Sequence, residues 1–471
     1  MNEKLDLSVL DAELRAAVLD IAARVKAAGG RALMVGGSVR DLLLGETHVK
    51  DVDIEVFGLA PDLLRRTVGA AYAFDECGVS FGVLKIKRLD IDVALPRREE
   101  KRGIGHRGFD ISADPTMSVR AAAARRDFTV NALYYDPLAE CLEDPYGGVA
   151  DLRSRILRHV SPRFVEDPLR VLRGMQFVAR FDLDPAPETV AICRTVTIEN
   201  LPPERLIEEW GKLLTKGRAI AKGLEFLRAT GWTQYFPELQ ALIGCEQDPH
   251  WHPEGDVWNH TLMALDAFAR NRCGDRDEDL VVGLAVLCHD FGKPATTRWD
   301  PVKERLRSLG HDEAGVAPTL SFLRRLTNEE RLLKEVPPLV QCHMRPFAMW
   351  KSQVGDAAIR RLALKVGRID RLLRVAQADD QGRPPEMSGG SSAGEDLRWL
   401  AAEAERLRVA AAVPKPILMG RHLLEMGYRP SPDFKRLLDA CFDAQLDGKF
   451  SDLDGARDYF RQHLCYNVKD V

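Results

Sequence analysis

Residues 32–56 constrain the fold of this chain more than any other stretch. An apolar run at residues 32–35 predicts a short strand, and Gly36 and Gly37 then allow the backbone to approach another group closely. The following VRDLLLG favours a short helix. After a polar turn, residues 51–56 alternate acidic and apolar side chains, which is the period-two pattern of a strand. These patterns predict a strand, a glycine turn, a short helix and a second strand.

On the second strand, Asp51 and Asp53 lie on one face and Glu55 follows further along. Adjacent carboxylates repel and raise each other's pKa unless a cation lies between them. An isolated Asp-x-Asp is more often a solvated strand face than a metal site. This pair follows a Gly-Gly turn and a helix, and magnesium takes oxygen ligands that it shares with substrate phosphates. We therefore expect Asp51 and Asp53 to bind Mg²⁺ beside a phosphate-binding turn.

The length of 471 residues predicts about two to four domains. The net charge of −4 is close to neutral, so any nucleic-acid surface must be a local basic patch. Residues 1–30 are acidic and amphipathic, unlike a signal peptide, and no apolar run approaches a membrane span in length. The nine cysteines are scattered without a Cys-x-x-Cys pair, which predicts reduced thiols in a cytoplasmic protein.

Three further stretches of the head have the patterns of a helix, of two strands and of a loop. Residues 8–28 have the apolar spacing of a helix, and FGVLKIKRLDIDVALP (81–96) alternates in two parts separated by a turn, which predicts two strands. Asp90 and Asp92 lie on one face of the second part, where an acid exposed at a sheet edge is the alternative to a metal ligand. RREEKRGIGHRGFDISADP (97–115) is polar, basic and rich in glycine, so it is predicted to be a mobile loop.

RRDFTVNAL (125–133) is typical of a phosphate-binding segment. Two adjacent arginines can simply be solvated, but Arg126 with Asp127 and Asn131 places donors and an acceptor on a common helical face. Arginine suits a triphosphate because its planar fork donates paired hydrogen bonds to phosphate oxygens. The two arginines are therefore candidates for contact with a phosphate.

Residues 164–181 predict a helix whose first turn contains EDPLR. Asp167 and Arg170 are spaced i, i+3, and Glu166 and Arg170 are spaced i, i+4, so both pairs share a helix face. A surface salt bridge of little energetic value is the alternative to a binding role.

GGSVRDLLLG followed by DVD, then RRDFTVNAL and EDPLR, resembles the signature of the class II nucleotidyltransferases, which comprise the tRNA CCA-adding enzymes and the bacterial poly(A) polymerases. LPPERLIEEWGKLL (201–214) resembles a structural motif of that family. The resemblance implies a polymerase-β-like head in which Asp92 supplies a third catalytic carboxylate beside Asp51 and Asp53. It also implies a set of nucleotide-binding residues, namely Gly36, Gly37, Arg40, Arg126, Asp127, Glu166, Asp167, Arg170 and Arg173.

Base selection is implied for Asp167 and Arg170, which offer an acceptor and a donor fork to the base edge. Cytosine and adenine each present an exocyclic amine donor and a ring-nitrogen acceptor, whereas uracil and guanine present a carbonyl in place of the amine. Glu166 is expected to hold Arg170, and Arg173 is expected to meet the triphosphate. Asp127 with Asn131 is expected to fix the ribose or the local framework.

A second set of residues resembles the HD metal-dependent phosphohydrolases. The ordered histidines and acids predict metal ligands at His260, His289, Asp290 and Asp379, with His311 and His343 as further candidates. Mixed imidazole and carboxylate ligands suit Ni²⁺, Mn²⁺, Fe²⁺ or Zn²⁺. A single such histidine is more often a packing residue, so the prediction depends on the whole set. In some bacterial CCA enzymes the resembled module has 2′,3′-cyclic phosphodiesterase, 2′-nucleotidase and phosphatase activities. His250 and His252 are expected to line its mouth without being ligands.

The predicted fold class is α+β, with a nucleotidyltransferase head (1–150), an all-helical neck carrying the nucleotide-recognition helix (151–242), an all-helical HD domain (243–394) and a helical tail (395–471). The predicted function is Mg²⁺-dependent addition of CMP and AMP to the tRNA 3′ end, with a second phosphohydrolase activity. The predicted partners are tRNA, ATP and CTP, without a membrane. A poly(A) polymerase or an enzyme adding only A or only CC is the nearest alternative. A phosphohydrolase with an RNA-binding head and a non-catalytic RNA-binding scaffold are the more distant ones.

Overall fold

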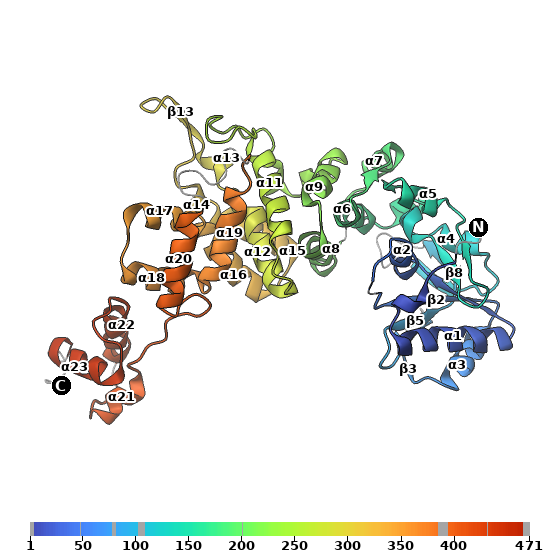
Figure 1. Cartoon of the computed structure of the whole chain (residues 1–471), viewed down its shortest axis with the longest axis horizontal. Helices are drawn as coiled ribbons and strands as arrows, with labels where there is room; N and C mark the ends of the chain where they lie inside the picture. The colour runs from blue at the N-terminus through green and yellow to red at the C-terminus, as the bar shows by residue number, and fades with distance from the viewer. Residues whose placement is uncertain are drawn as a thin grey trace. The chain divides into compact units, whose positions relative to one another are not determined.

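The computed structural model describes residues 4–47, 49–77, 82–101, 109–199, 201–384, 394–430 and 432–464. It divides into two compact units (Figure 1). The first comprises Met1–Leu213 and Gly217–Tyr235, and the second comprises Leu214–Lys216 and Phe236–Val471. The predicted head and nearly all of the predicted neck fall in the first unit, and the four-part division itself remains a prediction.

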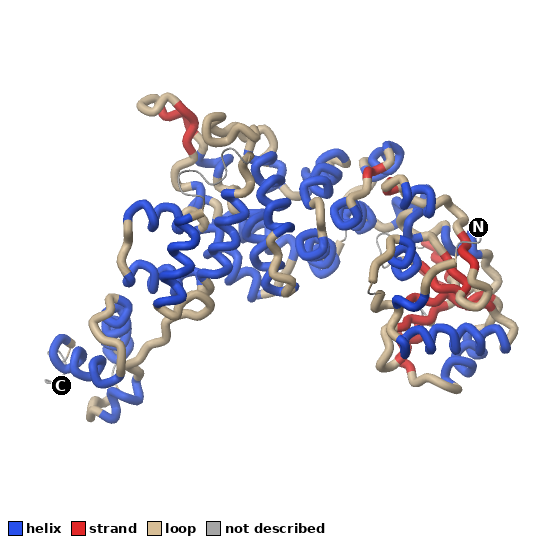
Figure 2. Tube along the Cα trace, viewed as in Figure 1, coloured by secondary structure: helices blue, strands red, loops and turns tan. Residues whose placement is uncertain are grey.

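The first unit contains a seven-stranded sheet in the order β3-β4-β5-β2-β1-β8-β9 (Figure 2). Its strands are β1 (Arg31–Val35), β2 (Val52–Phe57), β3 (Phe74–Cys77), β4 (Val83–Ile86), β5 (Ile91–Ala94), β8 (Tyr134–Asp136) and β9 (Cys141–Glu143). β2 pairs antiparallel with β1 and parallel with β5. The strands predicted within residues 32–35, 51–56 and 81–96 are all present, although Asp51 lies just before β2.

The alternation in β2 buries one side of the strand, where Val52, Ile54 and Val56 are at most 2% exposed. The helix predicted in residues 8–28 is α1 (Ala12–Ala27), whose first turn is capped by the Asp11 carboxylate. Apolar side chains of α1 and of the sheet form one core. The other helices here are α2 (Gly37–Leu43), α3 (Pro61–Gly69), α4 (Val119–Ala123) and α5 (Gly148–Arg153), with 3₁₀ turns η1 (Leu7–Val9) and η2 (Thr129–Asn131).

The prediction of a loop at 97–115 is wrong at both ends. β6 (Arg97–Lys101) and β7 (Phe109–Ala113) pair antiparallel in register from Arg97 with Ala113 to Lys101 with Phe109. Residues 102–108, at the centre of the predicted loop, lie outside the described residues. Composition suggested a loop because charged residues are rare in central strands, but a two-stranded ribbon tolerates them.

The remainder of the first unit is largely helical. Its helices are η3 (Pro162–Glu166), α6 (Leu169–Phe181), α7 (Pro187–Cys193), α8 (Pro203–Lys216), α9 (Ile220–Ala229) and η4 (Trp232–Tyr235). It also contains a short parallel pair, β10 (Ile156–Leu157) with β11 (Asp184–Pro185), so the expectation of an all-helical neck is corrected by one small sheet. α6 packs against α9, where Gly223 lies so close to Met175 that an added Cβ would approach its carbonyl oxygen to 2.6 Å.

The second unit is a helical assembly in which α11, α12, α16 and α19 pack side by side (Figure 1). Its helices are α10 (Pro237–Gln240), α11 (Val257–Arg270), α12 (Arg276–Cys288), α13 (Lys293–Thr296), α14 (His311–Ala314), α15 (Val316–Leu326), α16 (Glu330–Cys342), α17 (Arg345–Ser352), α18 (Asp356–Val366), α19 (Ile369–Asp380) and α20 (Glu395–Arg406). A hairpin of β12 (Arg298–Asp300) and β13 (Arg305–Arg307) interrupts this region, which is therefore not wholly helical as predicted.

The predicted tail ends in α21 (Gly420–Glu425), α22 (Asp433–Leu446) and α23 (Leu453–His463). These helices share a small apolar cluster that includes Leu423, Leu437 and Phe460. The α+β class is confirmed, with one large sheet and a largely helical remainder. Among the described residues, helices of the length and apolarity that a membrane span requires are absent.

Candidate active sites

A pocket of about 380 Å³ in the first unit brings together most of the residues predicted to bind metal and nucleotide. The predicted residues that line it are Asp53, Asp92, Arg126, Asp127, Asp167, Arg170 and Arg173. Asp51, Gly36, Gly37, Arg40 and Glu166 do not line it. The size of the pocket is suitable for a nucleotide.

The carboxylates at one side of this pocket come from neighbouring parallel strands. Asp53 of β2 lies directly opposite Asp92 of β5, the acid that the family resemblance implied as a third carboxylate. The pKa of Asp53 is raised because the protein surrounds the carboxyl, and the charges of Asp92 and Asp51 add to this shift against the opposing charge of Arg126. Asp92 also lies 3.3 Å from the ammonium of Lys85. Asp51 is exposed, and in the described residues the three carboxylates do not converge within 4.8 Å.

The glycine turn predicted to approach another group approaches Arg126. Gly36 has a φ of 73°, which favours glycine, and a Cβ there would lie 2.8 Å from Nη1 of Arg126. The turn therefore leaves space for the guanidinium on which phosphate binding was predicted to depend.

Glu55 contacts the arginines at this part of the pocket, and this role was not predicted. Its carboxylate is 2% exposed and accepts hydrogen bonds from Arg125 Nη2 at 2.7 Å and from the Tyr134 hydroxyl at 2.9 Å. Arg126 Nη2 lies 3.8 Å away. Burial favours the neutral acid, but Arg126 and Arg125 overcome this effect and lower the pKa of Glu55. The sequence signal was an acid continuing the alternation beyond Asp53.

The RRDFTVNAL segment does not form the helix on which its prediction was based. α4 ends at Ala123, and the segment continues as a turn followed by η2. The predicted contact nevertheless forms, because Asn131 Nδ2 donates to Asp127 Oδ1 at 3.0 Å. Arg173 donates to the other oxygen of Asp127 through Nε at 2.7 Å. Despite complete burial, these partners lower the pKa of Asp127, with Arg173 contributing most.

Arg40 lies in a different place from the one predicted. Its guanidinium is 4% exposed, donates to the amide oxygen of Asn131 and to Asp41, and packs over Phe181 at 4.3 Å. Phe181 belongs to α6, so Arg40 joins α2 to that helix. Its position indicates a bracing residue, whereas its sequence motif suggested a nucleotide ligand.

The predicted base-recognition residues have protein partners in this structure. Asp167 accepts from Arg205 at 2.8 Å, and Arg170 donates to the main-chain carbonyls of Arg163 at 2.8 Å and Arg125 at 2.6 Å. The ion pair recorded for Glu166 is with Arg163, at 3.4 Å, so the expected contact with Arg170 is replaced. The reason is that α6 begins at Leu169, so Glu166 lies in the preceding 3₁₀ turn and off the helix face.

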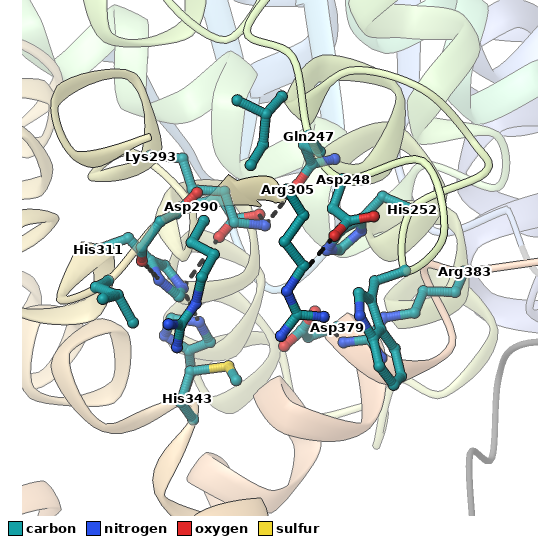
Figure 3. Close-up of a pocket in the computed structure, with 16 residues that line it drawn as sticks. Gln247, Asp248, His252, Asp290, Lys293, Arg305, His311, His343, Asp379 and Arg383 are labelled. Carbon is teal, nitrogen blue, oxygen red and sulfur yellow. Dashed lines mark hydrogen bonds and ion pairs between the residues drawn. The ribbon is translucent and has the colours of Figure 1, made fainter. Parts of the chain in front are cut away.

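The second unit brings the predicted histidines and acids together, and four of them, Asp290, His311, His343 and Asp379, line one pocket (Figure 3). His260 Nε2 lies 3.0 Å from Asp379 Oδ1, and His289 Nε2 lies 3.3 Å from Asp290 Oδ2. The residues come from α11, the end of α12, α14, the end of α16, and α19, and they are His260, His289, Asp290, His311, His343 and Asp379. Every predicted member of the set is therefore present in the cluster.

The histidines share one orientation. His289, His311 and His343 each place Nδ1 2.7–2.8 Å from the main-chain carbonyl three residues earlier. A carbonyl only accepts, so Nδ1 carries the proton and Nε2 is left as a lone-pair donor. His260 places Nδ1 2.9 Å from the Glu254 carboxylate with the same consequence. The Nε2 atoms of these four histidines are therefore unprotonated and could bind a metal.

Three groups of three potential ligands occur among the described residues. They are His252, Glu254 and His260; His260, His289 and Asp379; and Asp290, His311 and His343. Oδ2 of Asp290 faces His289, whereas Oδ1 lies 3.5 Å from His311. Burial favours the neutral acid, but His289 and Lys293 hold the pKa of Asp290 well below its usual range. Lys293 Nζ lies 2.7 Å from Asp290 and bonds to Gln247.

Glu254 was not predicted, although it fixes two residues of the site. Its side chain is 1% exposed and accepts from both His260 and His252, the latter at 2.8 Å. Burial opposes the shift, but the hydrogen bonds from the two histidines lower the pKa of Glu254 to about 2. His252 lines the mouth of the pocket as expected. A lone Glu in a Pro- and Gly-containing loop gave no periodic signal by which it could have been found.

Comparison with protein families supports the assignment of the first unit. A family described as "Poly A polymerase head domain" matches residues 32–158. A second family, described as "Probable RNA and SrmB- binding site of polymerase A", matches residues 182–243.

Known proteins match most of the chain. The multifunctional CCA protein of Xylella fastidiosa (strain M23) is 35% identical over 391 residues, which cover 79% of this chain and 89% of that protein. The multifunctional CCA protein of Stenotrophomonas maltophilia (strain R551-3) is 36% identical over 388 residues, covering 78% and 90%. The Bacillus stearothermophilus CCA-adding enzyme in complex with CTP has the same fold, with a TM-score of 0.63, 23% identity, and coverage of 96% and 98%.

Proposed function

Because this chain belongs to the tRNA nucleotidyltransferase family that contains the multifunctional CCA proteins, we propose that it adds CMP and AMP to the 3′ end of tRNA. The observation that carries the proposal is the placement of Asp53 beside Asp92 in a pocket whose other walls hold Arg126, Arg170 and Arg173. Metal-binding carboxylates and phosphate-binding arginines in one pocket are what a nucleotidyl transfer requires.

CCA-adding enzymes are metal-dependent nucleotidyltransferases, and the oxygen donors of Asp53, Asp92 and Asp51 fit Mg²⁺. When bound, Mg²⁺ lowers the pKa of the RNA 3′-hydroxyl and neutralises charge on the leaving pyrophosphate. Arg126 and Arg173 hold the triphosphate in line. The 3′ oxygen then bonds to the α-phosphorus while the bond to the β-phosphate oxygen breaks and pyrophosphate leaves.

Asp167 and Arg170 select cytosine or adenine through the amine and ring nitrogen of the base edge. Both are bonded to the protein in this structure, Asp167 to Arg205 and Arg170 to main-chain carbonyls. Base binding therefore requires an exchange of partners at the start of α6, and Arg205 is the group that the base displaces from Asp167.

Incorporation of labelled CTP and ATP, separately and together, tests this function. The acceptors are tRNA ending before CCA, tRNA ending in CC, and an unrelated RNA. We expect addition of C, C and A that then stops. Long A tails on every RNA would instead establish a poly(A) polymerase. A added only to tRNA ending in CC, or C alone added to the shorter tRNA, would establish a restricted enzyme.

The histidine cluster favours a second function, the hydrolysis of a phosphate ester such as a 2′,3′-cyclic phosphodiester. Within the described part of the chain, His289 Nε2 and Asp290 Oδ1 are buried atoms without a hydrogen bond, while Asp290 Oδ2 is ion-paired with Lys293 at 2.7 Å. Buried atoms without a partner fit metal ligands, and imidazole nitrogens with carboxylates suit Ni²⁺, Mn²⁺, Fe²⁺ or Zn²⁺. His260, His289, Asp290 and Asp379 would hold one ion, and Asp290, His311 and His343 would hold a second.

When bound, the metal supplies an activated water at neutral pH. The residues of the chain orient the ester, and water adds to phosphorus as one phosphorus–oxygen ester bond breaks. Turnover of uridine 2′,3′-cyclic phosphate by the full chain, after loading with each of the four metals in turn, tests the proposal. We expect one or more of them to give turnover, and the absence of turnover with all four would refute it.

A further inference from the structure

Side chains other than the candidate metal ligands also line the pocket of the second unit, which has a volume of about 210 Å³. Trp251, Arg305 and Arg383 are among them, and Arg383 Nη2 lies 4.0 Å from Asp379 Oδ1. The pocket therefore offers an aromatic face and two guanidinium groups in addition to the histidines and acids.

Trp251 is 48% exposed although it lines the pocket. Isolated exposed tryptophans are common on protein surfaces, so exposure alone assigns nothing to it. The neighbouring residue, however, is anchored to the histidine cluster. His252 is hydrogen bonded to Glu254, which also holds His260. The loop therefore holds Trp251 beside the pocket that it lines.

Arg305 reaches the same wall from β13. Its guanidinium carbon lies 6.0 Å from the centre of the Trp251 ring, and its Nε lies 3.8 Å from Asp248. Nε is buried and makes no hydrogen bond within the described residues. Figure 3 shows Arg305 extending across the pocket between Asp248 and Asp379. A guanidinium in this position can bind an anion held above the metal ligands.

We propose that Trp251 and Arg305 determine the specificity of this pocket for nucleoside phosphate esters, with the indole stacking on the base and the guanidinium binding the phosphate. Aromatic and arginine side chains together recognise bases without sequence preference, because every base has a flat face. An ester that lacks a base can contact only the guanidinium and not the indole. The inference rests on the proposed phosphohydrolase function and adds to it the two residues that set its preference among esters.

The test compares uridine 2′,3′-cyclic phosphate with 1-O-methylribose 2,3-cyclic phosphate, which lacks a base. Uridine is chosen because the base-selecting pair of the first unit disfavours uracil. Trp251→Ala should raise KM for the uridine ester about 10-fold and leave KM for the base-free ester unchanged. Arg305→Gln should raise KM for both esters. Trp251→Phe should restore most of the loss, because a smaller ring still stacks.

The hairpin supplies matched controls. Trp299 is 61% exposed and Arg298 lies on the paired strand, and neither lines the pocket. Trp299→Ala and Arg298→Gln should leave both KM values unchanged. Calorimetric titration of the full chain with uridine 2′-monophosphate gives a readout that does not need turnover, and Trp251→Ala should weaken this binding about 10-fold.

The outcomes separate the two proposals. Turnover of both esters with the same KM in the wild-type chain, or an equal effect of Trp251→Ala on both, overturns the specificity inference and leaves the phosphohydrolase function standing. A wild-type chain that turns over neither ester overturns the function and the inference with it.

Discussion

The two pockets of this protein hold their charged groups in opposite ways. In the first unit Asp53 and Asp92, two of the three acids proposed to bind Mg²⁺, line the pocket, whereas Asp51 does not, and the three do not converge. In the second unit the ligand atoms converge within 4.8 Å and almost all are buried. Mg²⁺ shares its ligands with substrate phosphates, so an open carboxylate set is complete only with the nucleotide present. A transition metal bound by imidazoles instead requires a preformed set.

The arginines of the two pockets also differ in how their hydrogen-bond donors are satisfied. Arg170 and Arg173 are bonded to the protein, and the base and triphosphate must compete with these contacts. Arg305, in contrast, has a buried Nε without a hydrogen bond in the described chain. The first pocket is therefore suited to a sequence of different nucleotides, because its recognition groups exchange partners. The second is suited to one class of ester.

The largest expected effect is on the first pocket. Asp53→Ala should lower nucleotide incorporation by about 1,000-fold or more, because it removes the central metal ligand. Hydrolysis of the cyclic phosphate should be unchanged. The measurement is incorporation of labelled CTP into tRNA lacking CCA, with Asp90→Asn as the control, since Asp90 lies outside this pocket. Survival of incorporation in Asp53→Ala would mean that the metal site is misplaced.

Substitutions in the second pocket should have the opposite effect, lowering ester hydrolysis but not nucleotide incorporation. His289→Ala combined with Asp290→Ala should lower ester hydrolysis by about 1,000-fold or more and leave incorporation unchanged. Both rates are measured on the same preparation, and His463→Ala on α23 serves as the control. An equal loss of incorporation in the double variant would show that the two sites depend on each other.

A smaller effect is expected on metal content. The two groups of ligands around Asp290 predict two ions per chain after reloading, and His311→Ala should leave about one. Elemental analysis of the desalted protein measures this ratio. His250→Ala is the matched control, because His250 is exposed and outside the cluster. The same metal content in His311→Ala and in the wild-type chain would restrict the site to the other group.

The smallest effect is expected at Glu55. Glu55→Gln removes the charge that holds Arg125 and Arg126, so KM for the nucleotide should rise about 10-fold, or about 1.4 kcal/mol, with little change in kcat. Glu76→Gln on β3 is the control, since Glu76 is exposed and pairs with Arg65 at the far edge of the sheet. A loss confined to kcat would contradict the positioning role.

Local patterns were reliable where a contact depends on one strand or one pair of strands. Alternation predicted the strands that carry Asp53 and Asp92, the family resemblance singled out Asp92, and the parallel register places the two acids opposite each other. The ordered histidines and acids were predicted as one set, and the fold brings them together. These successes share a cause, because strand periodicity and ligand type are properties of the residues themselves.

Patterns failed where the partner came from a distant segment. Nothing in the spacing of EDPLR indicates that Asp167 bonds to Arg205, which is 38 residues away. Arg40 looked like a phosphate ligand in its motif, but α6 covers it with Phe181. Glu254 gave no signal before the fold placed it between His252 and His260.

The sequence by itself determined the α+β class, the strands that carry the carboxylates, and the types of residue available for metal and phosphate. Only the tertiary structure decided which arginine each acid holds, which histidine nitrogen is free, and that Trp251 and Arg305 share a wall. The physical reason is the distance along the chain over which each interaction acts. Periodicity and ligand chemistry act within a segment, whereas a hydrogen bond or a stacked ring selects its partner only after distant segments have packed.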